Sequence, residues 1–243
     1  MVVKSQIKFI KNLQQKKYRN LHGLFVVEGV KVVQELLDSD FKVYKVFCTN
    51  DAILDVADDL LEIISENDLK KISSLKTPNK VLAVFYMPQP KKISELDWVL
   101  VLDDVRDPGN LGTIVRLCDW FGITDLVCSK QTVDCYNPKT LQATMGSITR
   151  VNIVYADIVE FLTSQPLPVY GAFMNGDKVY SENLPLKKGV LVMGNEANGI
   201  SKEVEELIAK RISIPQFGNT STESLNVATA TAILLNEIRR SNS

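Results

Sequence analysis

The chain is poor in the residue types on which several kinds of active site depend. It contains one histidine, His22, in a turn ahead of an expected strand, so a histidine-based metal site or a Ser-His-Asp triad would rest on a single imidazole. Its 4 cysteines include no CxxC pair and lie in or near apolar segments. This pattern predicts reduced thiols in a cytoplasmic protein rather than a disulfide framework. We expect no metal at the functional site.

Long apolar runs and a large net charge are also missing. No segment approaches the ~20 apolar residues of a membrane span, and the N-terminal stretch has no signal-peptide core. We therefore expect no membrane association. The formal net charge of -1 means that any surface for nucleic acid must be local. With 45% hydrophobic residues, the chain can bury the core of one large domain or two modest ones.

Hydrophobic periodicity predicts an α/β fold in two parts. Strand and helix patterns alternate up to Met87, and a second alternating series begins at Trp98. The segment 88–97 between them has two prolines and little apolar content, which is typical of a linker. The prediction is a small α/β domain over residues 1–87, a linker over 88–97 and a larger α/β domain over 98–243.

The first of three notable loops in the larger domain is "DPGNLG", residues 107–112, which follows an apolar strand ending in acids. Asn110 stands where a helix N-cap would, so capping is its structural alternative. Arg116 lies about two turns into the expected helix, and its structural alternative is a surface ion pair with Asp119 or another acid.

The second loop is "GNEANGIS", residues 194–201, and the third contains "SLN", residues 224–226. Glycines after a buried strand let a ligand approach the backbone, whereas Glu196 at that place calls for polar partners. The alternative is a polar turn with Ser201 as a helix cap. Ser224 is the expected cap of the final helix. Neither a GxGxxG pattern nor a phosphate-loop lysine is present, which argues against a dinucleotide or phosphate enzyme.

Together the three loops resemble the ordered motifs of the SpoU/TrmH family of RNA ribose 2'-O-methyltransferases, in the SPOUT superfamily. The resemblance spans about Trp98 to Arg240. Asn110 and Arg116 match the first motif, Glu196 the second, and residues 224–226 the third. Residues 25–29, "FVVEG", resemble a signature of the family's substrate-binding domain. The loop "QFGNTSTE", residues 216–223, is longer than the family pattern.

The resemblance implies a SPOUT-type sheet with a trefoil knot, S-adenosylmethionine held mainly by backbone groups, and a homodimer. The implied catalytic residues are Asn110, Arg116, Glu196 and Asn226. Because arginine is a poor base, we expect Arg116 to bind a phosphate and stabilise the developing alkoxide. The small, apolar face of the last helix fits either a dimer contact or burial within one protomer. The implied cofactor-binding residues are Phe173, Gly194, Asn195, Ile214, Ser224 and Leu225.

A local basic surface is visible at the N-terminus, where every charged residue before Glu28 is basic. We expect it to bind RNA phosphates, with a solvated helix face as the alternative. The expected RNA-binding residues are Lys4, Lys8, Lys11, Lys16, Lys17, Arg19, Lys139 and Arg150.

The expected function is S-adenosylmethionine-dependent 2'-O-methylation of RNA ribose. Ribosomal RNA is favoured over tRNA because of the additional N-terminal domain. The alternatives are a tRNA methyltransferase and a non-catalytic RNA-binding or ribosome-assembly protein. The presence of all four motif residues disfavours the non-catalytic alternative.

Overall fold

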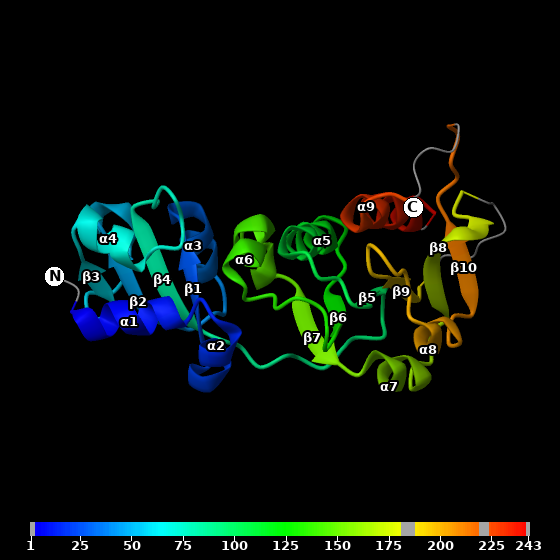
Figure 1. The fold of residues 1–243 in the computed structure, drawn as a ribbon, viewed down its shortest axis with the longest axis horizontal. Helices are drawn as coiled ribbons and strands as arrows, with labels where there is room; N and C mark the ends of the chain where they lie inside the picture. The colour runs from blue at the N-terminus through cyan, green and yellow to red at the C-terminus, as the bar shows by residue number, and fades with distance from the viewer. Residues whose placement is uncertain (1–2, 181–187, 219–223, 242–243) are drawn as a thin grey trace. The chain divides into compact units, whose positions relative to one another are not determined.

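The structure, a computed structural model, describes residues 3–180, 188–218 and 224–241 and divides into two compact units. One unit contains Met1–Gln89 and Asp134–Thr149, and the other contains Pro90–Val133 and Arg150–Ser243 (Figure 1). None of the described helices is long and apolar enough to cross a membrane. All four cysteines are buried, and none of them forms a disulfide.

The N-terminal unit has a four-stranded sheet in the order β1-β4-β2-β3. Strands β1 and β2 run antiparallel to β4, and β3 runs parallel to β2. Its first 89 residues contain α1 (Lys4–Asn12), α2 (Lys16–His22), β1 (Leu24–Glu28), α3 (Val30–Leu37), β2 (Val43–Cys48), the 3-10 turn η1 (Asp51–Ile53), β3 (Leu61–Ile63), α4 (Glu66–Ile72) and β4 (Val81–Tyr86).

Local chemistry explains where these helices begin and end. The basic N-terminal stretch forms the two helices α1 and α2, and α2 ends at Gly23, whose φ of 63° suits glycine. Helix α4 begins behind Ser65, whose side chain accepts a hydrogen bond from the Asp68 N–H.

The segment Asp134–Thr149 returns to the N-terminal unit and carries α6 (Pro138–Thr144) and η2 (Ser147–Thr149). Helix α6 contacts β1. A buried ion pair between Arg19 and Asp134 anchors the segment, and the Arg19 Nε–Asp134 Oδ2 distance is 3.0 Å. Arg19 is 2% exposed and also donates to the Leu13 and Gln14 carbonyl oxygens.

This burial corrects the sequence prediction for Arg19. A buried guanidinium needs an anion and acceptors nearby, and Arg19 finds them inside its own unit. It is therefore not presented to an RNA phosphate.

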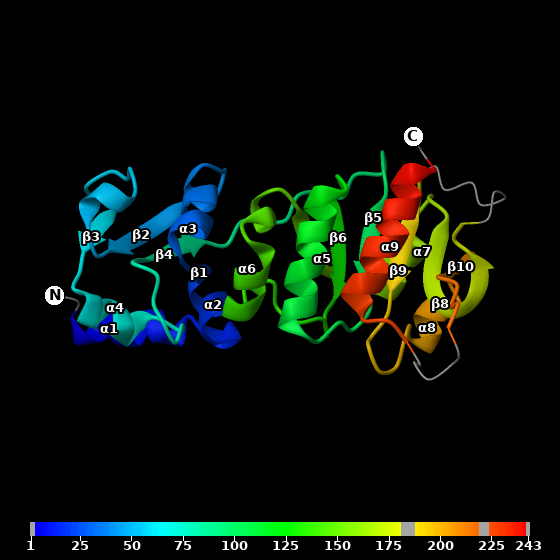
Figure 2. The same ribbon diagram turned by 90° about the horizontal axis from the view of Figure 1, so that it is seen from above.

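The C-terminal unit is built on a six-stranded parallel sheet in the order β10-β8-β9-β5-β6-β7. Helices α5 and α9 cover one face, and α7 and α8 the other (Figures 1 and 2). The α/β prediction is confirmed in this parallel form. The elements are β5 (Val99–Leu102), α5 (Pro108–Trp120), β6 (Asp125–Ser129), β7 (Asn152–Ala156), α7 (Ile158–Thr163), β8 (Val169–Lys178), β9 (Val190–Met193), α8 (Lys202–Glu205), β10 (Lys210–Ser213) and α9 (Val227–Arg240).

Burial on both faces explains why the central strands are apolar throughout. All residues of β5 and β9 are buried, as expected for inner strands of a parallel sheet covered by helices. Arg239 of α9 is held at the opposite end from the helix start, where it donates to the Phe121 carbonyl oxygen and to both oxygens of Asp97. The start of α9, at the other end of the helix, lies beside the loops that follow β5 and β9.

Candidate functional site

Asn110 joins the three polar loops of the C-terminal unit. Its Nδ2 donates to Glu196 Oε1 at 2.8 Å, and its Oδ1 accepts from Asn226 Nδ2 at 2.9 Å. The N-cap of α5 is Asp107, whose side chain accepts the Asn110 N–H at 2.8 Å. Asn110 is therefore not the cap, and its side-chain amide is available to the other two loops.

Asn226, rather than Ser224, caps the final helix. Its Oδ1 accepts hydrogen bonds from the N–H groups of Ala228 and Thr229, at 2.9 and 3.2 Å. The same side chain donates to Asn110, so one amide both begins α9 and connects it to α5. Glu196 is exposed at the other end of this network. The Glu196 carboxylate is therefore not desolvated, and its notable contact is the hydrogen bond that it accepts from Asn110.

Arg116 does not join this network. It lies six residues after Asn110, which turns its direction by about 120° around the helix, and it is exposed. Asp119, an expected partner, instead binds Arg150 at 2.9 Å. Over residues 3–180, 188–218 and 224–241, no ion pair or hydrogen bond of the Arg116 side chain is found. The structure thus brings together three of the four predicted catalytic residues.

A cavity of about 990 Å³ lies beside the network, at the middle of β8, the carboxyl ends of β9 and β10 and the start of α9. Strand β8 loses its register with β10 between Gly171 and Asp177, and the residues that it displaces line the cavity. Glu196 also borders it. All six predicted cofactor-binding residues line this cavity, namely Phe173, Gly194, Asn195, Ile214, Ser224 and Leu225.

The cavity suits a nucleoside-sized cofactor in volume and in chemistry. Ligand sites of this kind measure ~300–1,000 Å³ and combine apolar walls with a few polar groups. Phe173, Ile214 and Leu225 provide apolar surface for a flat base. The Arg211 guanidinium carbon lies 3.7 Å from the Phe173 ring centroid and covers one face of that ring. Residues 219–223 of the longer loop lie outside the described residues.

Gly194 permits the tight turn that closes one wall of the cavity. The loop folds back so that Asn195 and Gly199 exchange two backbone hydrogen bonds, both 2.9 Å long. A Cβ on residue 194 would lie 2.3 Å from the Gly199 carbonyl carbon and 2.4 Å from the Ile200 nitrogen. Only glycine therefore allows this backbone contact.

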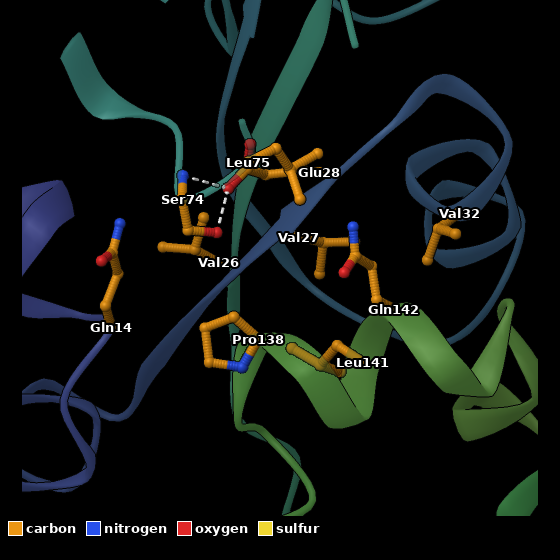
Figure 3. Close-up of a pocket in the computed structure, with 10 residues that line it drawn as sticks. All are labelled: Gln14, Val26, Val27, Glu28, Val32, Ser74, Leu75, Pro138, Leu141 and Gln142. Carbon is orange, nitrogen blue, oxygen red and sulfur yellow. Dashed lines mark hydrogen bonds between the residues drawn. The ribbon is translucent and has the colours of Figure 1, made fainter. Parts of the chain in front are cut away.

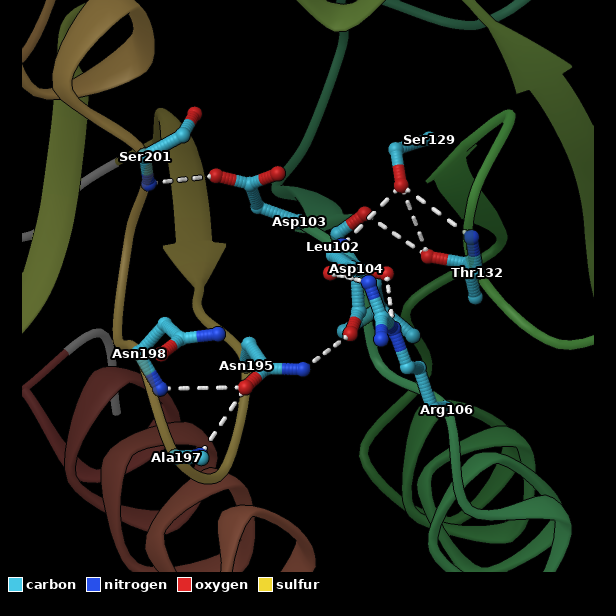
Figure 4. Close-up of polar contacts among 10 residues, drawn as sticks. All are labelled: Leu102, Asp103, Asp104, Arg106, Ser129, Thr132, Asn195, Ala197, Asn198 and Ser201. Atoms are coloured by element: carbon cyan, nitrogen blue, oxygen red, sulfur yellow. Dashed lines mark hydrogen bonds and ion pairs between the residues drawn. The ribbon is translucent and has the colours of Figure 1, made fainter.

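The side chain of Asn195 shapes the same loop. Its Oδ1 accepts from the N–H groups of Ala197 and Asn198, and its Nδ2 donates to the Asp104 carbonyl oxygen at 2.7 Å (Figure 4). Since both ends of the amide are used in these contacts, Asn195 acts on the loop's conformation. Any contact of Asn195 with a cofactor is expected from its backbone.

The turn after β5, which contains Asp103 and Asp104, contacts the loop 194–201 at a second point. The sequence analysis assigned no role to this turn. The carboxylate of Asp103, which is 6% exposed, accepts the Ser201 N–H at 2.7 Å (Figure 4). Asp104 has a φ of 59°, and its N–H donates to Ser129 Oγ. Arg106 pairs with the Asp104 carboxylate. Two acids directly after an apolar strand were the available sequence signal.

Loss of the Asp103 carboxylate is expected to loosen the loop 194–201. In Asp103→Ala, Ser201 loses a charge-assisted hydrogen bond, so we expect about tenfold weaker S-adenosylmethionine binding by calorimetry. The matched control is Asp125→Ala, which removes an equally buried carboxylate at the opposite strand ends, where it accepts from Asn152 and Thr124. Both variants should melt earlier, and equal cofactor affinity in the two would contradict this role for Asp103.

A second, much smaller cavity lies in the N-terminal unit under Glu28 (Figure 3). Its volume of about 20 Å³ is enough for about one water molecule, so it is no ligand site. Glu28 Oε1 accepts from the Ser74 N–H and Oγ, which ties the loop after α4 to β1. The glutamate of the "EG" signature thus has a structural role.

Among the described residues, no group of three His, Cys, Asp or Glu side chains could hold a metal.

The predicted RNA-binding residues other than Arg19 are exposed. Arg150 is engaged with Asp119, while the lysines line the surface of the N-terminal unit. These lysines are Lys4, Lys8, Lys11, Lys16, Lys17 and Lys139.

Comparison with known proteins bears on the whole chain. Residues 97–236 match the SpoU rRNA Methylase family, and residues 4–83 match the MRM3-like substrate binding domain. The 23S rRNA (guanosine(2553)-2'-O)-methyltransferase RlmP of Bacillus subtilis is 31% identical over 242 residues, covering 96% of each chain.

Solved structures agree with these matches. A TrmH-family structure from Porphyromonas gingivalis has a TM-score of 0.90 and 39% identity, covering 99% of each chain. An AdoMet-bound rRNA methyltransferase from Sinorhizobium meliloti has a TM-score of 0.86 and 30% identity, covering 99% of this chain and 96% of that one. The family resemblance is confirmed, and the chain belongs to the SpoU rRNA methylase family.

Proposed function

We propose that this protein transfers a methyl group from S-adenosylmethionine to a ribose 2'-oxygen of ribosomal RNA. The observation that carries the proposal is the Asn110–Glu196–Asn226 network at the border of a cavity lined by all six predicted cofactor-binding residues. The 23S rRNA 2'-O-methyltransferase activity of the B. subtilis relative and the AdoMet-bound state of the S. meliloti structure support the same assignment.

The residues of this chain have separate tasks in that reaction. S-adenosylmethionine, when bound, supplies an activated methyl group, so the protein must mainly align the ribose and favour loss of the hydroxyl proton. Asn110 and Asn226 hold each other in place beside the cavity and orient the ribose. Glu196 fixes the Asn110 amide. Arg116 meets the phosphate and the negative charge that grows on the 2'-oxygen.

The proposal includes a homodimer in which Arg116 serves the cofactor site of the partner. Arg116 is exposed and points away from the network of its own chain, which supports action on another copy. We also include a trefoil knot formed by the C-terminal segment, as the family resemblance implies. The packing of α9 against α5 is compatible with it.

We propose that residues 1–87 form an RNA-binding domain, joined through 88–97 to a methyltransferase domain over 98–243. The match of residues 4–83 to a substrate-binding domain and the exposed lysines of α1 and α2 support this assignment. We also propose a cytoplasmic location, which the RNA substrate and the absence of disulfides among the four buried cysteines support.

Calorimetry and methyl-transfer assays test the proposal. Purified protein should bind S-adenosylmethionine without added metal and transfer labelled methyl groups to ribosomal RNA from a strain that lacks the gene, but not to RNA from the parent strain. Nuclease-resistant dinucleotides would locate the methyl on a 2'-oxygen. Transfer to tRNA alone would move the assignment to the tRNA class. Cofactor binding without transfer to any RNA would refute the activity.

A further inference from the structure

Four aromatic rings form a continuous row on the N-terminal unit. The ring centroids of Phe9 and His22 are 5.1 Å apart, those of Phe9 and Tyr44 6.2 Å, and those of Tyr44 and Tyr86 5.8 Å. We call these four residues the aromatic row. Tyr44 is 43% exposed and Tyr86 44% exposed, so its tyrosine end is open to solvent. These two tyrosines are not absorbed into the hydrophobic core.

Four separate segments contribute these rings, so it is the tertiary fold that brings them together. Strand β2 departs from regular pairing with β4 between Val43 and Lys45, which leaves Tyr44 between two paired positions. Tyr86 ends β4, and its N–H donates to the Lys42 carbonyl oxygen. Phe9 comes from α1, and His22 is the last residue of α2.

The helices that support the row are strongly basic. Between residue 3 and residue 27 the chain contains no acid, and the first is Glu28. Lys8 and Lys11 flank Phe9 in sequence on α1, and Lys42 precedes Tyr44 on the way into β2; all three are exposed. One acid reaches α1, since Glu62 accepts a hydrogen bond from Gln6. The surroundings of the row therefore favour a polyanion.

Exposed aromatic rings among lysines match the chemistry of unpaired nucleotides. Bases that have left a duplex offer flat faces that stack on aromatic side chains, while lysines neutralise the phosphates on either side. Bases inside a duplex are already stacked on each other and present only their edges. A protein partner would gain less from such a surface, because the cores of protein–protein interfaces are poor in lysine.

We propose that the aromatic row is a stacking platform for one or two unpaired bases of the RNA substrate, with the α1 lysines holding the adjacent phosphates. The inference rests on the proposed function, in which the substrate is RNA. It adds that the substrate presents a loop or bulge to the N-terminal unit. Recognition of an unpaired segment would then separate the intended site from ordinary duplex RNA.

Binding of two RNA probes tests the proposal. One probe is a hairpin with an unpaired loop, and the other is a fully paired duplex of the same length. We expect Tyr44→Ala/Tyr86→Ala to weaken hairpin binding about tenfold to a hundredfold by fluorescence anisotropy and to leave duplex binding unchanged. Tyr44→Phe/Tyr86→Phe should bind like the wild type, because it keeps the rings. The matched control is Ile63→Ala, which truncates an apolar side chain that is 49% exposed on the same sheet.

A spectroscopic measurement on the folded wild-type protein covers the case in which the alanine variant fails to fold. A 2-aminopurine base in the hairpin loop should be quenched on binding to the wild type and to the phenylalanine variant. Unquenched loop fluorescence, or hairpin binding by the folded alanine variant at wild-type affinity, would overturn the platform. Lys4→Gln/Lys8→Gln/Lys11→Gln should weaken both probes and flatten the salt dependence.

The lysine variant separates the two proposals. If it loses RNA affinity while the tyrosine variant does not, the RNA surface stands and the aromatic row has no part in it. If the wild type binds neither probe nor ribosomal RNA, the result contradicts the proposed function itself and not only the aromatic row.

Discussion

Replacing Arg116 with alanine is expected to lower the single-turnover rate of methyl transfer by about 10² to 10³, the usual effect of removing one donor to a developing oxyanion. The affinity for S-adenosylmethionine should change little, because Arg116 is exposed and does not line the cavity that contains the predicted cofactor-binding residues. An interaction that is strongest in the transition state appears in kcat rather than in binding. Single-turnover methylation and calorimetry on the same preparation measure both quantities.

Two further measurements distinguish this role from a structural one. Arg116→Lys should restore little activity, because an ammonium group cannot make the two parallel hydrogen bonds of a guanidinium. The melting temperature of Arg116→Ala should stay close to that of the wild type, since Asp119 is already paired with Arg150. A clear loss of thermal stability with normal turnover in the folded fraction would make Arg116 a structural residue.

Mixed dimers test whether Arg116 acts on the partner. Co-expression of Arg116→Ala with a subunit that cannot bind the cofactor should give about a quarter of the wild-type activity. Half of the dimers are then mixed, and each mixed dimer has one complete site if the arginine is supplied across the interface. No recovery of activity would place the arginine and the cofactor in the same chain.

Gly194→Ala provides such a subunit and is the second change with a large expected effect. The added Cβ would lie 2.3 Å from the Gly199 carbonyl carbon, a backbone atom that cannot turn aside as a side chain could. The loop between Asn195 and Gly199 must therefore move away from the cavity. We expect S-adenosylmethionine binding at least about 100-fold weaker, with a stability loss of about 1–3 kcal/mol from overpacking.

Gly218→Ala is the matched control for this substitution. Gly218 lines the same cavity, but a Cβ built there meets no atom of the described residues within 4 Å. Its cofactor affinity should stay near that of the wild type. Calorimetry and thermal melting of both variants measure the contrast, and wild-type affinity in Gly194→Ala would show that the loop does not form the cofactor wall.

Much of this molecule follows from short-range sequence patterns. Apolar runs of strand length alternate with helical periodicity, and this predicted both α/β parts, because backbone hydrogen bonding and burial of one face act over a few residues. Glycine and asparagine at strand ends marked the loops that line the cavity. The residue types that bind or orient a ligand are restricted enough for three short motifs to indicate the family.

Contacts between distant parts of the chain were decided by the tertiary structure. Arg19 looks like one more exposed cation in a basic run, but it is buried against Asp134, which lies 115 residues later. That pair helps to return the segment Asp134–Thr149 to the N-terminal unit. No local sequence pattern predicts that this segment joins the N-terminal unit, because the contact that stabilises it involves a residue remote in sequence.

The same division applies to the predicted catalytic residues. Their types and order were readable in the chain, because each motif is local. Their arrangement was not: Asn110 contacts Glu196 and Asn226 only because the strand order brings the ends of β5 and β9 and the start of α9 to one edge of the sheet. Local preferences specify which element forms, whereas the order of parallel strands depends on how helices and long connections pack across the whole sheet.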